Sequence, residues 1–182
     1  MKIGVYIGSF NPVHKGHIEI AKHLVERNYV DKLLILPTPN YWNKQDLVDI
    51  NHRVNMLKLL EEENIIVDDT HNNYPFTYEV LNALKKDYKD DELYIIMGVD
   101  NLEKLHLWKN VDEIFKYNIL LIPRGNTTCN IKKYPKEKMM LVSDFKGIDI
   151  SSTQIRKNLN NKYLDEKVRK YIIKNNLYKE VK

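Results

Sequence analysis

Two histidines stand three positions apart where the first apolar run of the chain ends. Residues 8–17 read GSFNPVHKGH and directly follow the run IGVYI. The stretch has neither the G-x-G-x-x-G nor the G-x-x-x-x-G-K-S/T pattern of the common phosphate-binding loops. Its Asn-Pro pair indicates a turn, and a helix that follows the turn would begin near His17. Unpaired N–H groups at a helix start attract anions, and the imidazoles of His14 and His17 would add further N–H donors.

A zinc site is the alternative for this histidine pair. Zinc would need at least one more ligand, but the sequence has no H-E-x-x-H motif, and its one cysteine, Cys129, cannot build a cysteine-rich site. We therefore expect no protein-held metal ion. The isolated histidines His23, His71 and His106 are expected to be exposed or hydrogen-bonded within the fold.

A second anion-binding pattern lies near the other end of the chain, in ISSTQIR at 150–156. Ser151 or Ser152 suits the N-cap of a helix, where hydroxyls and free amides gather. Arg156, about one turn later, could aim a planar fork of donors at the same anion. Alone, this pattern is also that of an ordinary capped helix with a surface arginine.

The elements that must position these two motifs alternate along the chain. Short runs that are apolar on both faces alternate with segments whose apolar residues recur every three or four positions. This alternation is typical of an α/β fold, in which helices flank a parallel sheet. The predicted strands are 2–8, 32–39, 64–69, 92–98, 118–124 and 138–142, helical patterns include Ile18, Val54 and Val80, and 151–159 and 165–177 form a helical C-terminal region.

The segments that follow the predicted strands mix glycine, polar and basic residues. Ligands of open parallel sheets bind outside the carboxyl ends of the strands, so function should gather there. We expect the histidine loop and ISSTQIR to meet at this edge and bind a polyphosphate between them. The segments are SFNPVHKGH, PNYWNK, GVDNLEKLHLW, PRGN and DISSTQIR.

The composition fits one ordinary soluble domain. The chain has 182 residues, 43% hydrophobic and 30% charged, which is enough to bury a sizeable core. We expect a single domain over 1–182, with its core in 1–148 and a small helical part in 149–182. The lone cysteine, the lack of a targeting signal and the lack of an apolar run of ~18 residues favour a cytoplasmic protein.

The charge balance mildly favours anionic partners. The formal net charge is +4, and the densest basic stretch is IKKYPKEK at 131–138. We interpret this stretch as a solvated lysine-rich loop, because Tyr134 alone offers no aromatic platform for nucleic acid. Small-molecule nucleotides are the expected partners, with neither nucleic acid nor a membrane, and the sequence leaves open whether the chain forms a homo-oligomer.

The two motifs carry a family resemblance. The first loop resembles the G-x-F-x-P-x-H-x-G-H motif of the nucleotidyltransferase superfamily, and DISSTQIR is similar to its I-S-S-T-x-I-R motif. Over nearly the whole chain, the sequence resembles the nicotinate-nucleotide adenylyltransferases of that superfamily, which implies a Rossmann-like parallel sheet. The further matching segments are His52-Arg53, Phe76-Thr77-Tyr78, Gly98-Val99-Asp100, Leu107-Trp108-Lys109 and Pro123-Arg124.

The resemblance implies adenylyl transfer in NAD biosynthesis. The 5′-phosphate of a pyridine mononucleotide would attack the α-phosphorus of ATP, giving a dinucleotide and pyrophosphate. Two like unit charges 4 Å apart repel by about 4 kcal/mol at an effective dielectric of 20, so the site must supply donors and cations. A phosphate is already a nucleophile, so positioning and charge stabilisation suffice. Mg²⁺ is expected on the ATP phosphates.

The same resemblance assigns roles to individual residues. Asp100 would accept hydrogen bonds from ribose hydroxyls, Arg124 would stack on adenine, and the indole of Trp108 would attract the cationic pyridine ring. The implied catalytic residues are His14, His17 and Arg156. The implied ATP-binding residues are Gly8, Ser9, Phe10, His14, His17, Gly98, Asp100, Arg124, Ser151, Ser152, Thr153 and Arg156. The implied residues for the pyridine nucleotide are Asn11, Lys44, Arg53, Thr77 and Trp108.

Two departures from the family pattern leave the acceptor open. Asn43 stands where the nicotinate enzymes usually have histidine, and Asn11 where the bacterial pattern often has aspartate. GSFNP is similar to enzymes that accept both nicotinate and nicotinamide mononucleotides. The alternative functions are another adenylyltransferase of the superfamily, such as phosphopantetheine adenylyltransferase, a nucleotide-binding regulator without turnover and, from the pI alone, a nucleic-acid-binding protein.

Overall fold

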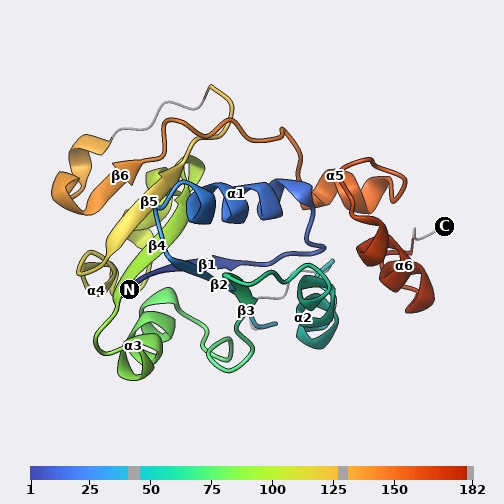
Figure 1. Cartoon of the computed structure of the whole chain (residues 1–182), viewed down its shortest axis with the longest axis horizontal. Coiled ribbons are helices and arrows are strands. Elements are labelled where there is room, and N and C mark those ends of the chain that lie inside the picture. Colours follow the sequence, from blue (N-terminus) through green and yellow to red (C-terminus); the bar gives the residue numbers. More distant parts are fainter. Residues whose placement is uncertain (41–45, 127–130, 180–182) are drawn as a thin grey trace.

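The computed structural model describes residues 1–40, 46–126 and 131–179. Its described strands form one six-stranded parallel sheet in the order β3-β2-β1-β4-β5-β6, which confirms the predicted α/β class (Figure 1). The strands are β1 (Lys2–Gly8), β2 (Lys32–Pro37), β3 (Ile65–Val67), β4 (Glu92–Gly98), β5 (Asn118–Ile122) and β6 (Met139–Leu141).

Several strands are shorter than the apolar runs that predicted them. β3 ends before Asp68, whose side chain accepts backbone N–H groups of the next turn, from Thr70 at 2.8 Å and His71 at 2.9 Å. β5 ends before Pro123, which has no N–H to donate to a ladder. Polar turns and proline therefore set boundaries that hydrophobicity alone does not.

The strands are apolar on both faces because both faces are covered. On β2, Leu33 and Ile35 belong to one buried cluster, and Leu34 and Leu36 belong to the other. Successive side chains of a strand point to opposite faces, so a continuous apolar run feeds two cores. This pattern explains why the sequence favoured buried parallel strands.

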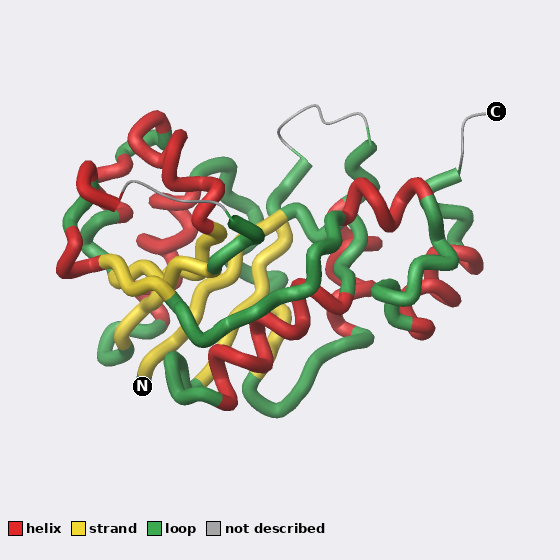
Figure 2. Tube along the Cα trace, turned by 90° about the horizontal axis from the view of Figure 1, so that it is seen from above, coloured by secondary structure: helices red, strands yellow, loops and turns green. Residues whose placement is uncertain are grey.

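Helices contribute to both clusters, and those of the C-terminal region join the cluster of α1. In Figure 2 the strands (yellow) lie between groups of helices (red). The first cluster receives side chains from α1 (Lys15–Glu26), α2 (Ile50–Lys58), α5 (Ser152–Lys157) and α6 (Glu166–Lys174). The second receives them from α3 (Thr77–Asp87), α4 (Val111–Ile114) and the 3₁₀ helix η1 (Val99–Leu107).

The lysine-rich stretch before β6 is not wholly solvated, which corrects the sequence-based expectation. It forms two short 3₁₀ helices, η2 (Ile131–Lys133) and η3 (Lys136–Lys138). Tyr134 between them is buried, and its hydroxyl donates to the backbone carbonyl of Leu102. Lys132, Lys133 and Lys136 are exposed, on a segment that the tyrosine anchors to η1.

All described strands are parallel, but the order in which the chain adds them to the sheet reverses beside β1. From β1 the chain continues through β2 to β3 on one side, whereas β4, β5 and β6 lie on the other. A sheet with such a switch point opens a crevice outside the carboxyl ends of its two central strands. Here those ends are Gly8 of β1 and Gly98 of β4. Among the described residues, no helix combines the length and apolar character needed to cross a membrane.

The C-terminal helices lie against the start of α1. Figure 1 shows α5 and α6 together at one end of the molecule, next to the turn between β1 and α1. The backbone N–H of Lys15 donates to the carbonyl of Tyr163 at 2.8 Å. Val168 and Ile172 of α6 are fully buried in the cluster that α1 also lines. The two ends of the sequence are therefore packed together, as the motif pattern predicts.

Candidate active site

A cavity of about 970 Å³ opens at the carboxyl edge of the sheet, at the switch point between β1 and β4. Its wall comes from the ends of β1, β4 and β5, from the starts of α1 and α3, and from the segment before α5. The predicted residues in the wall are Gly8, Ser9, His14, His17, Thr77, Gly98, Asp100, Trp108, Arg124, Ser151 and Ser152.

His14 and His17 form a stacked pair at the start of α1. Their ring centroids are 3.7 Å apart, with an angle of 22° between the ring planes. His14 is the N-cap, and its Nδ1 accepts the N–H of Gly16 at 3.1 Å. The Nδ1 of His17 accepts the backbone N–H of His14, also at 3.1 Å. The two histidines thus cap the helix reciprocally, a role usually taken by serine and glutamate.

This capping fixes the tautomer of both rings. A ring nitrogen that accepts a hydrogen bond carries no proton, so the proton of each neutral imidazole sits on Nε2. Both rings line the cavity. The local backbone therefore presents His14 and His17 as two Nε2–H donors held side by side.

Gly16 is what lets the His14 ring lie over the helix start. A Cβ at position 16 would come within 2.9 Å of His14 Cε1 and 3.0 Å of Ile150 Cγ2. Neither neighbour has room to move, because His14 caps the helix and Ile150 is buried beside it. Glycine at this position therefore permits the close approach of the His14 ring to the backbone.

Burial keeps both histidines neutral. Desolvation, with a smaller contribution from the positive charge of Arg124, lowers the pKa of His14 to about 4. The pKa of His17 is also well below its usual value, through burial first, then through repulsion from His14 when that ring is protonated, and then through the charge of Arg124. At neutral pH the pair therefore offers hydrogen-bond donors without permanent charge.

The second motif contacts the backbone of the first. Ser151 caps α5 and accepts the N–H of Gln154 at 3.2 Å. Ser152 Oγ donates to the carbonyl of Pro12 at 2.9 Å, and Arg156 Nη1 donates to the carbonyl of Asn11 at 2.8 Å. The predicted meeting of the two motifs is confirmed. However, Thr153 and Arg156 lie outside the cavity wall. The guanidinium of Arg156 donates instead to the loop carbonyl of Asn11 and to the hydroxyl of Thr153.

An ion pair and an aromatic group occupy other parts of the wall. Arg124 Nη1 lies 3.3 Å from Asp100 Oδ2, joining the segments that follow β4 and β5. Trp108 and Thr77 stand in the wall beside Phe76 and Lys109, and the Lys109 Nζ lies 4.4 Å from the centre of the Phe76 ring. This part of the wall thus presents the carboxylate of Asp100, the cations of Arg124 and Lys109, and the rings of Phe76 and Trp108.

Besides Thr153 and Arg156, three more predicted site residues are not brought to the cavity. Phe10, Asn11 and Arg53 are buried and stand outside its wall. Arg53 is completely inaccessible and donates to the carbonyls of Val48 and Ser9, both at 2.9 Å. Because its guanidinium donates to backbone carbonyls of the protein, Arg53 holds the first loop in place at Ser9. Lys44, together with Asn43, lies outside the described residues.

Sequence reasoning missed several aromatic and small residues of the wall. Tyr6 belongs to an apolar strand whose pattern gives no reason to single it out. Phe145 and Gly147 precede the second motif, and the motif extended toward its N-terminal side would have included them. A Cβ on Gly147 would lie 2.7 Å from the Phe145 ring, so the glycine permits a close approach of that ring.

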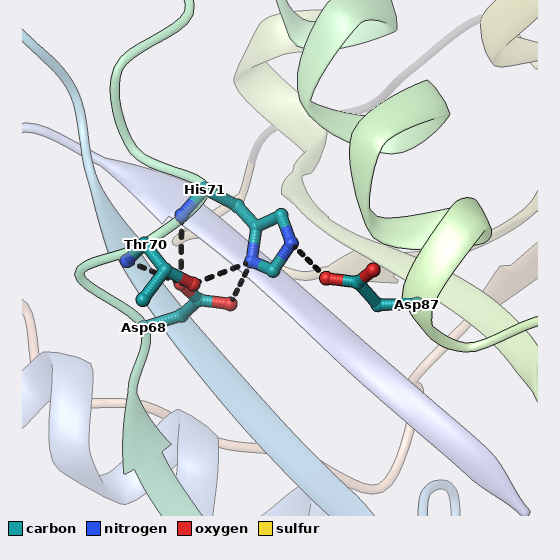
Figure 3. A network of polar contacts seen from close by, with 4 residues as sticks. All are labelled: Asp68, Thr70, His71 and Asp87. Carbon is teal, nitrogen blue, oxygen red and sulfur yellow. Dashed lines mark hydrogen bonds and ion pairs between the residues drawn. The ribbon is translucent and has the colours of Figure 1, made fainter.

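A second histidine site lies outside the cavity wall, on the loop between β3 and α3. His71 Nδ1 is 2.7 Å from Asp68 Oδ2, and its Nε2 is 2.8 Å from Asp87 Oδ2 (Figure 3). Asp68 is buried and also accepts the hydroxyl of Thr70 at 3.0 Å. We call these four residues, Asp68, Thr70, His71 and Asp87, the aspartate–histidine clasp. It joins the end of β3 to the end of α3.

No group of three or more His, Cys, Asp or Glu residues in the described part of the chain could hold a metal ion. The cavity wall does contain the carboxylates of Asp100 and Asp149. Asp100 is already paired with Arg124. This donor set suits an ion that arrives on a phosphate ligand and keeps most of its water.

Neutral imidazole donors at a helix start, at the switch point of a parallel sheet, suit the binding of phosphate groups and are consistent with the nucleotidyltransferase class. Residues 5–158 match the cytidylyltransferase-like family model. A probable nicotinate-nucleotide adenylyltransferase of Acholeplasma laidlawii is 38% identical over 191 residues, covering 98% of each chain. The nicotinate-nucleotide adenylyltransferase of Bacillus subtilis is 30% identical over 190 residues, covering 97% of this chain and 98% of its own. The chain belongs to the cytidylyltransferase-like family and, within it, to the nicotinate-nucleotide adenylyltransferases.

Solved structures show the same fold. The Plasmodium falciparum nicotinic acid mononucleotide adenylyltransferase in complex with NaAD superposes with a TM-score of 0.81 at 24% identity, covering 97% of both chains. A putative nicotinate-nucleotide adenylyltransferase of Vibrio parahaemolyticus gives a TM-score of 0.67 at 20% identity, covering 94% of this chain and 98% of its own. The Rossmann-like sheet expected from the sequence is thereby confirmed.

Proposed function

We propose that this protein transfers the adenylyl group of ATP to the 5′-phosphate of nicotinate mononucleotide in NAD biosynthesis. An acceptor phosphate oxygen attacks the α-phosphorus of ATP, and the bond from that phosphorus to the bridging oxygen breaks. Pyrophosphate leaves with the electron pair of the broken bond. The observation that carries this proposal is the reciprocally capped pair of neutral histidines, in a chain whose relatives bear the name of this activity.

The histidine pair suits the electrostatic problem of this reaction. Two phosphate groups repel, and about 4 kcal/mol per unit charge pair must be offset at 4 Å. The two Nε2–H groups would donate to oxygens of the α- and β-phosphates and stabilise charge as pyrophosphate departs. Their neutral state and fixed tautomer mean that they need no proton transfer before they act. Ser151 and Ser152, in the same wall, would contact the outer phosphates.

The remaining wall residues would separate the two nucleotides. Asp100 would accept hydrogen bonds from the ribose hydroxyls, and Arg124 would leave Asp100 partly free by stacking on adenine. Trp108 would receive the cationic pyridine ring, since an indole face attracts a desolvated cation by about 2 kcal/mol. Nicotinamide mononucleotide, which carries the same cationic ring, would be the second acceptor. Bound on the phosphates, Mg²⁺ would supply further neutralisation of their charge.

The test is a pyrophosphate-release assay with purified protein, ATP and Mg²⁺. Nicotinate mononucleotide, nicotinamide mononucleotide and phosphopantetheine are supplied separately as acceptors. We expect pyrophosphate release with nicotinate mononucleotide, and release at the same rate or more slowly with nicotinamide mononucleotide. Release with phosphopantetheine alone would assign the chain to a different adenylyl acceptor. ATP binding without release in any arm would make it a nucleotide-binding regulator.

A further inference from the structure

We infer that Tyr178, near the end of the described chain, is a positioning residue that holds the first loop in its working shape through Asn11. This inference rests on the proposed function, since it concerns how the nucleotide loop at residues 9–12 is kept in place. Tyr178 belongs to neither motif, and it lies 167 positions from its partner in the sequence.

The first loop is held from outside by side chains of distant elements. Arg53 Nη1 donates to the carbonyl of Ser9 at 2.9 Å, and Ser152 Oγ donates to the carbonyl of Pro12 at 2.9 Å. Arg156 Nη1 donates to the carbonyl of Asn11 at 2.8 Å. These bonds come from α2 and α5, so the path of the loop depends on elements on two sides of it.

Asn11 is the centre of this arrangement. Its Nδ2 donates to the carbonyl of Asp46 at 2.7 Å. Its Oδ1 accepts the N–H of Val48 at 3.2 Å and the hydroxyl of Tyr178 at 2.6 Å. The tyrosine supplies the shortest of the three bonds, and Asn11 itself is 5% exposed. A buried amide in this position is costly to leave short of a partner.

The environment of Tyr178 keeps it a donor. Burial raises the pKa of its hydroxyl, although the positive charges of Arg156 and Arg53 act in the opposite direction. The hydroxyl therefore remains protonated at every pH at which the protein would work. A neutral O–H that faces the amide oxygen of Asn11 can only donate to it.

The backbone on both sides of this contact is in the left-handed region. Tyr178 has φ 55°, and Phe10, which precedes Asn11, has φ 46°. Bulky residues adopt this region at a cost of about 1–3 kcal/mol, and they keep it only where the surroundings impose it. The hydroxyl bond joins one of these positions, Tyr178, to Asn11, the residue that directly follows the other.

Phe10 carries the effect from Asn11 to the histidine pair. The Phe10 ring is buried and packs edge-on against His17, with ring centroids 4.9 Å apart. It also packs edge-on against Tyr6, at 5.2 Å. A shift of the loop at Asn11 therefore moves the ring that supports His17, which is why loss of the Tyr178 hydroxyl should reduce turnover as well as stability.

The test compares Tyr178→Phe with the matched control Tyr171→Phe. Tyr171 lies on α6, and its hydroxyl lies 2.8 Å from His52 Nδ1 and 3.1 Å from Asn55 Nδ2, away from the first loop. Both variants lose one hydroxyl from the same C-terminal region. We expect similar losses of melting temperature. We expect kcat/KM for ATP to fall about tenfold in Tyr178→Phe only, on the scale of one hydrogen bond.

A second readout does not depend on turnover. The ring resonances of His17 in a ¹⁵N-labelled sample should shift in Tyr178→Phe and stay unchanged in Tyr171→Phe. Equal kinetics and equal His17 resonances in the two variants would overturn the inference. If the wild-type protein turned over no mononucleotide, the proposed function would fail, and the His17 resonances together with calorimetric ATP affinity would still decide the role of Tyr178.

Discussion

Two histidine sites lie at the carboxyl edge of one sheet, and the fold shifts their pKa values in opposite directions. His14 and His17 follow β1, and each accepts a backbone N–H at Nδ1. His71 follows β3 and lies between two carboxylates in the aspartate–histidine clasp. The pKa is lowered for the first pair and raised for His71.

Burial alone does not decide this difference. Desolvation lowers the pKa of all three imidazoles and is the largest contribution for each. Only around His71 do hydrogen bonds and charges, from Asp68 and Asp87, outweigh it. The comparison teaches that the partner decides whether a buried imidazole becomes a neutral donor or a cation. The first pair offers neutral hydrogen-bond donors to a ligand in the cavity. The clasp instead fixes the loop that leads from β3 to Thr77 at the start of α3.

The largest expected effect comes from removing one member of the neutral pair. His17→Ala should keep the fold and lose ~10²–10³-fold in turnover, the scale of one removed donor to developing charge. His71→Ala is the matched control, because it removes a half-buried imidazole at the same edge of the sheet. It should reduce stability and leave kcat within about threefold, since its partners lie outside the cavity. Steady-state kinetics with melting curves check both, and unchanged turnover in His17→Ala would remove His17 from the mechanism.

His14→Asn separates the two functions of the first site. Asparagine is a good N-cap, so its side-chain oxygen should still accept the N–H of Gly16 and preserve the start of α1. Its shorter amide should not replace the Nε2–H, and loss of one bond to a charged phosphate is worth about 1.5–3 kcal/mol, or roughly 10- to 100-fold in turnover. Circular dichroism and pyrophosphate release are the measurements. A large loss of helix content instead of activity would make His14 purely structural.

The two sites should contribute to the free energy of unfolding with opposite pH dependences. The pKa of His14 falls from 6.5 in the unfolded chain to about 4 in the fold, so unfolding takes up protons in that window. Wild-type stability should therefore fall as pH drops from 6.5 to 4, by up to about 1.4 kcal/mol per pH unit for one histidine. Urea unfolding of the wild type and His14→Asn checks this, and the variant should lose less over the window.

His71 should contribute in the opposite direction. Its pKa is raised in the fold, so its stabilisation is complete below 6.5 and is lost as pH rises through the folded value. The stability gap between the wild type and His71→Gln should therefore shrink as pH rises above 6.5. A gap that is constant with pH would mean that the clasp holds a neutral ring.

The smallest expected effect is that of the exposed carboxylate of the clasp. Asp87 has a side chain 64% exposed, so solvent screens its ion pair with His71. Asp87→Asn should cost less than about 1 kcal/mol, while Asp68→Asn, at 7% exposure and with several hydrogen bonds, should cost more. Denaturant unfolding of the two variants ranks them, and the reverse order would contradict the assignment of Asp68 as the main partner.

Much of the fold and part of the site follow from local patterns. Apolar runs predicted six parallel strands, and the Asn-Pro turn predicted a helix start near His17. N-cap chemistry predicted a second helix start at Ser151 or Ser152, because caps depend on residues only two or three positions apart. The meeting of the two motifs followed from the rule that parallel strands share one carboxyl edge.

The hydrogen-bond partners that lie far apart in the sequence could not be predicted from it. Arg53 looked like a ligand-binding arginine, but it is buried because the backbone at Ser9 and Val48 supplies acceptors around it. The partner of His71 on α3 is sixteen residues away, and no spacing rule connects the two. Asn11 likewise has its partners set by the path of distant segments.

The contacts between the two ends of the chain also have a consequence for biosynthesis. The loop at residues 9–12 leaves the ribosome about 140 residues or more before its partners Ser152, Arg156 and Tyr178, because these sequence separations are 140, 145 and 167. A nascent chain that has emerged only as far as β6 contains the six described strands of the sheet but lacks these partners. The loop therefore gains its full set of partners only after residues 152–178 have been synthesised, later than the strands of the sheet.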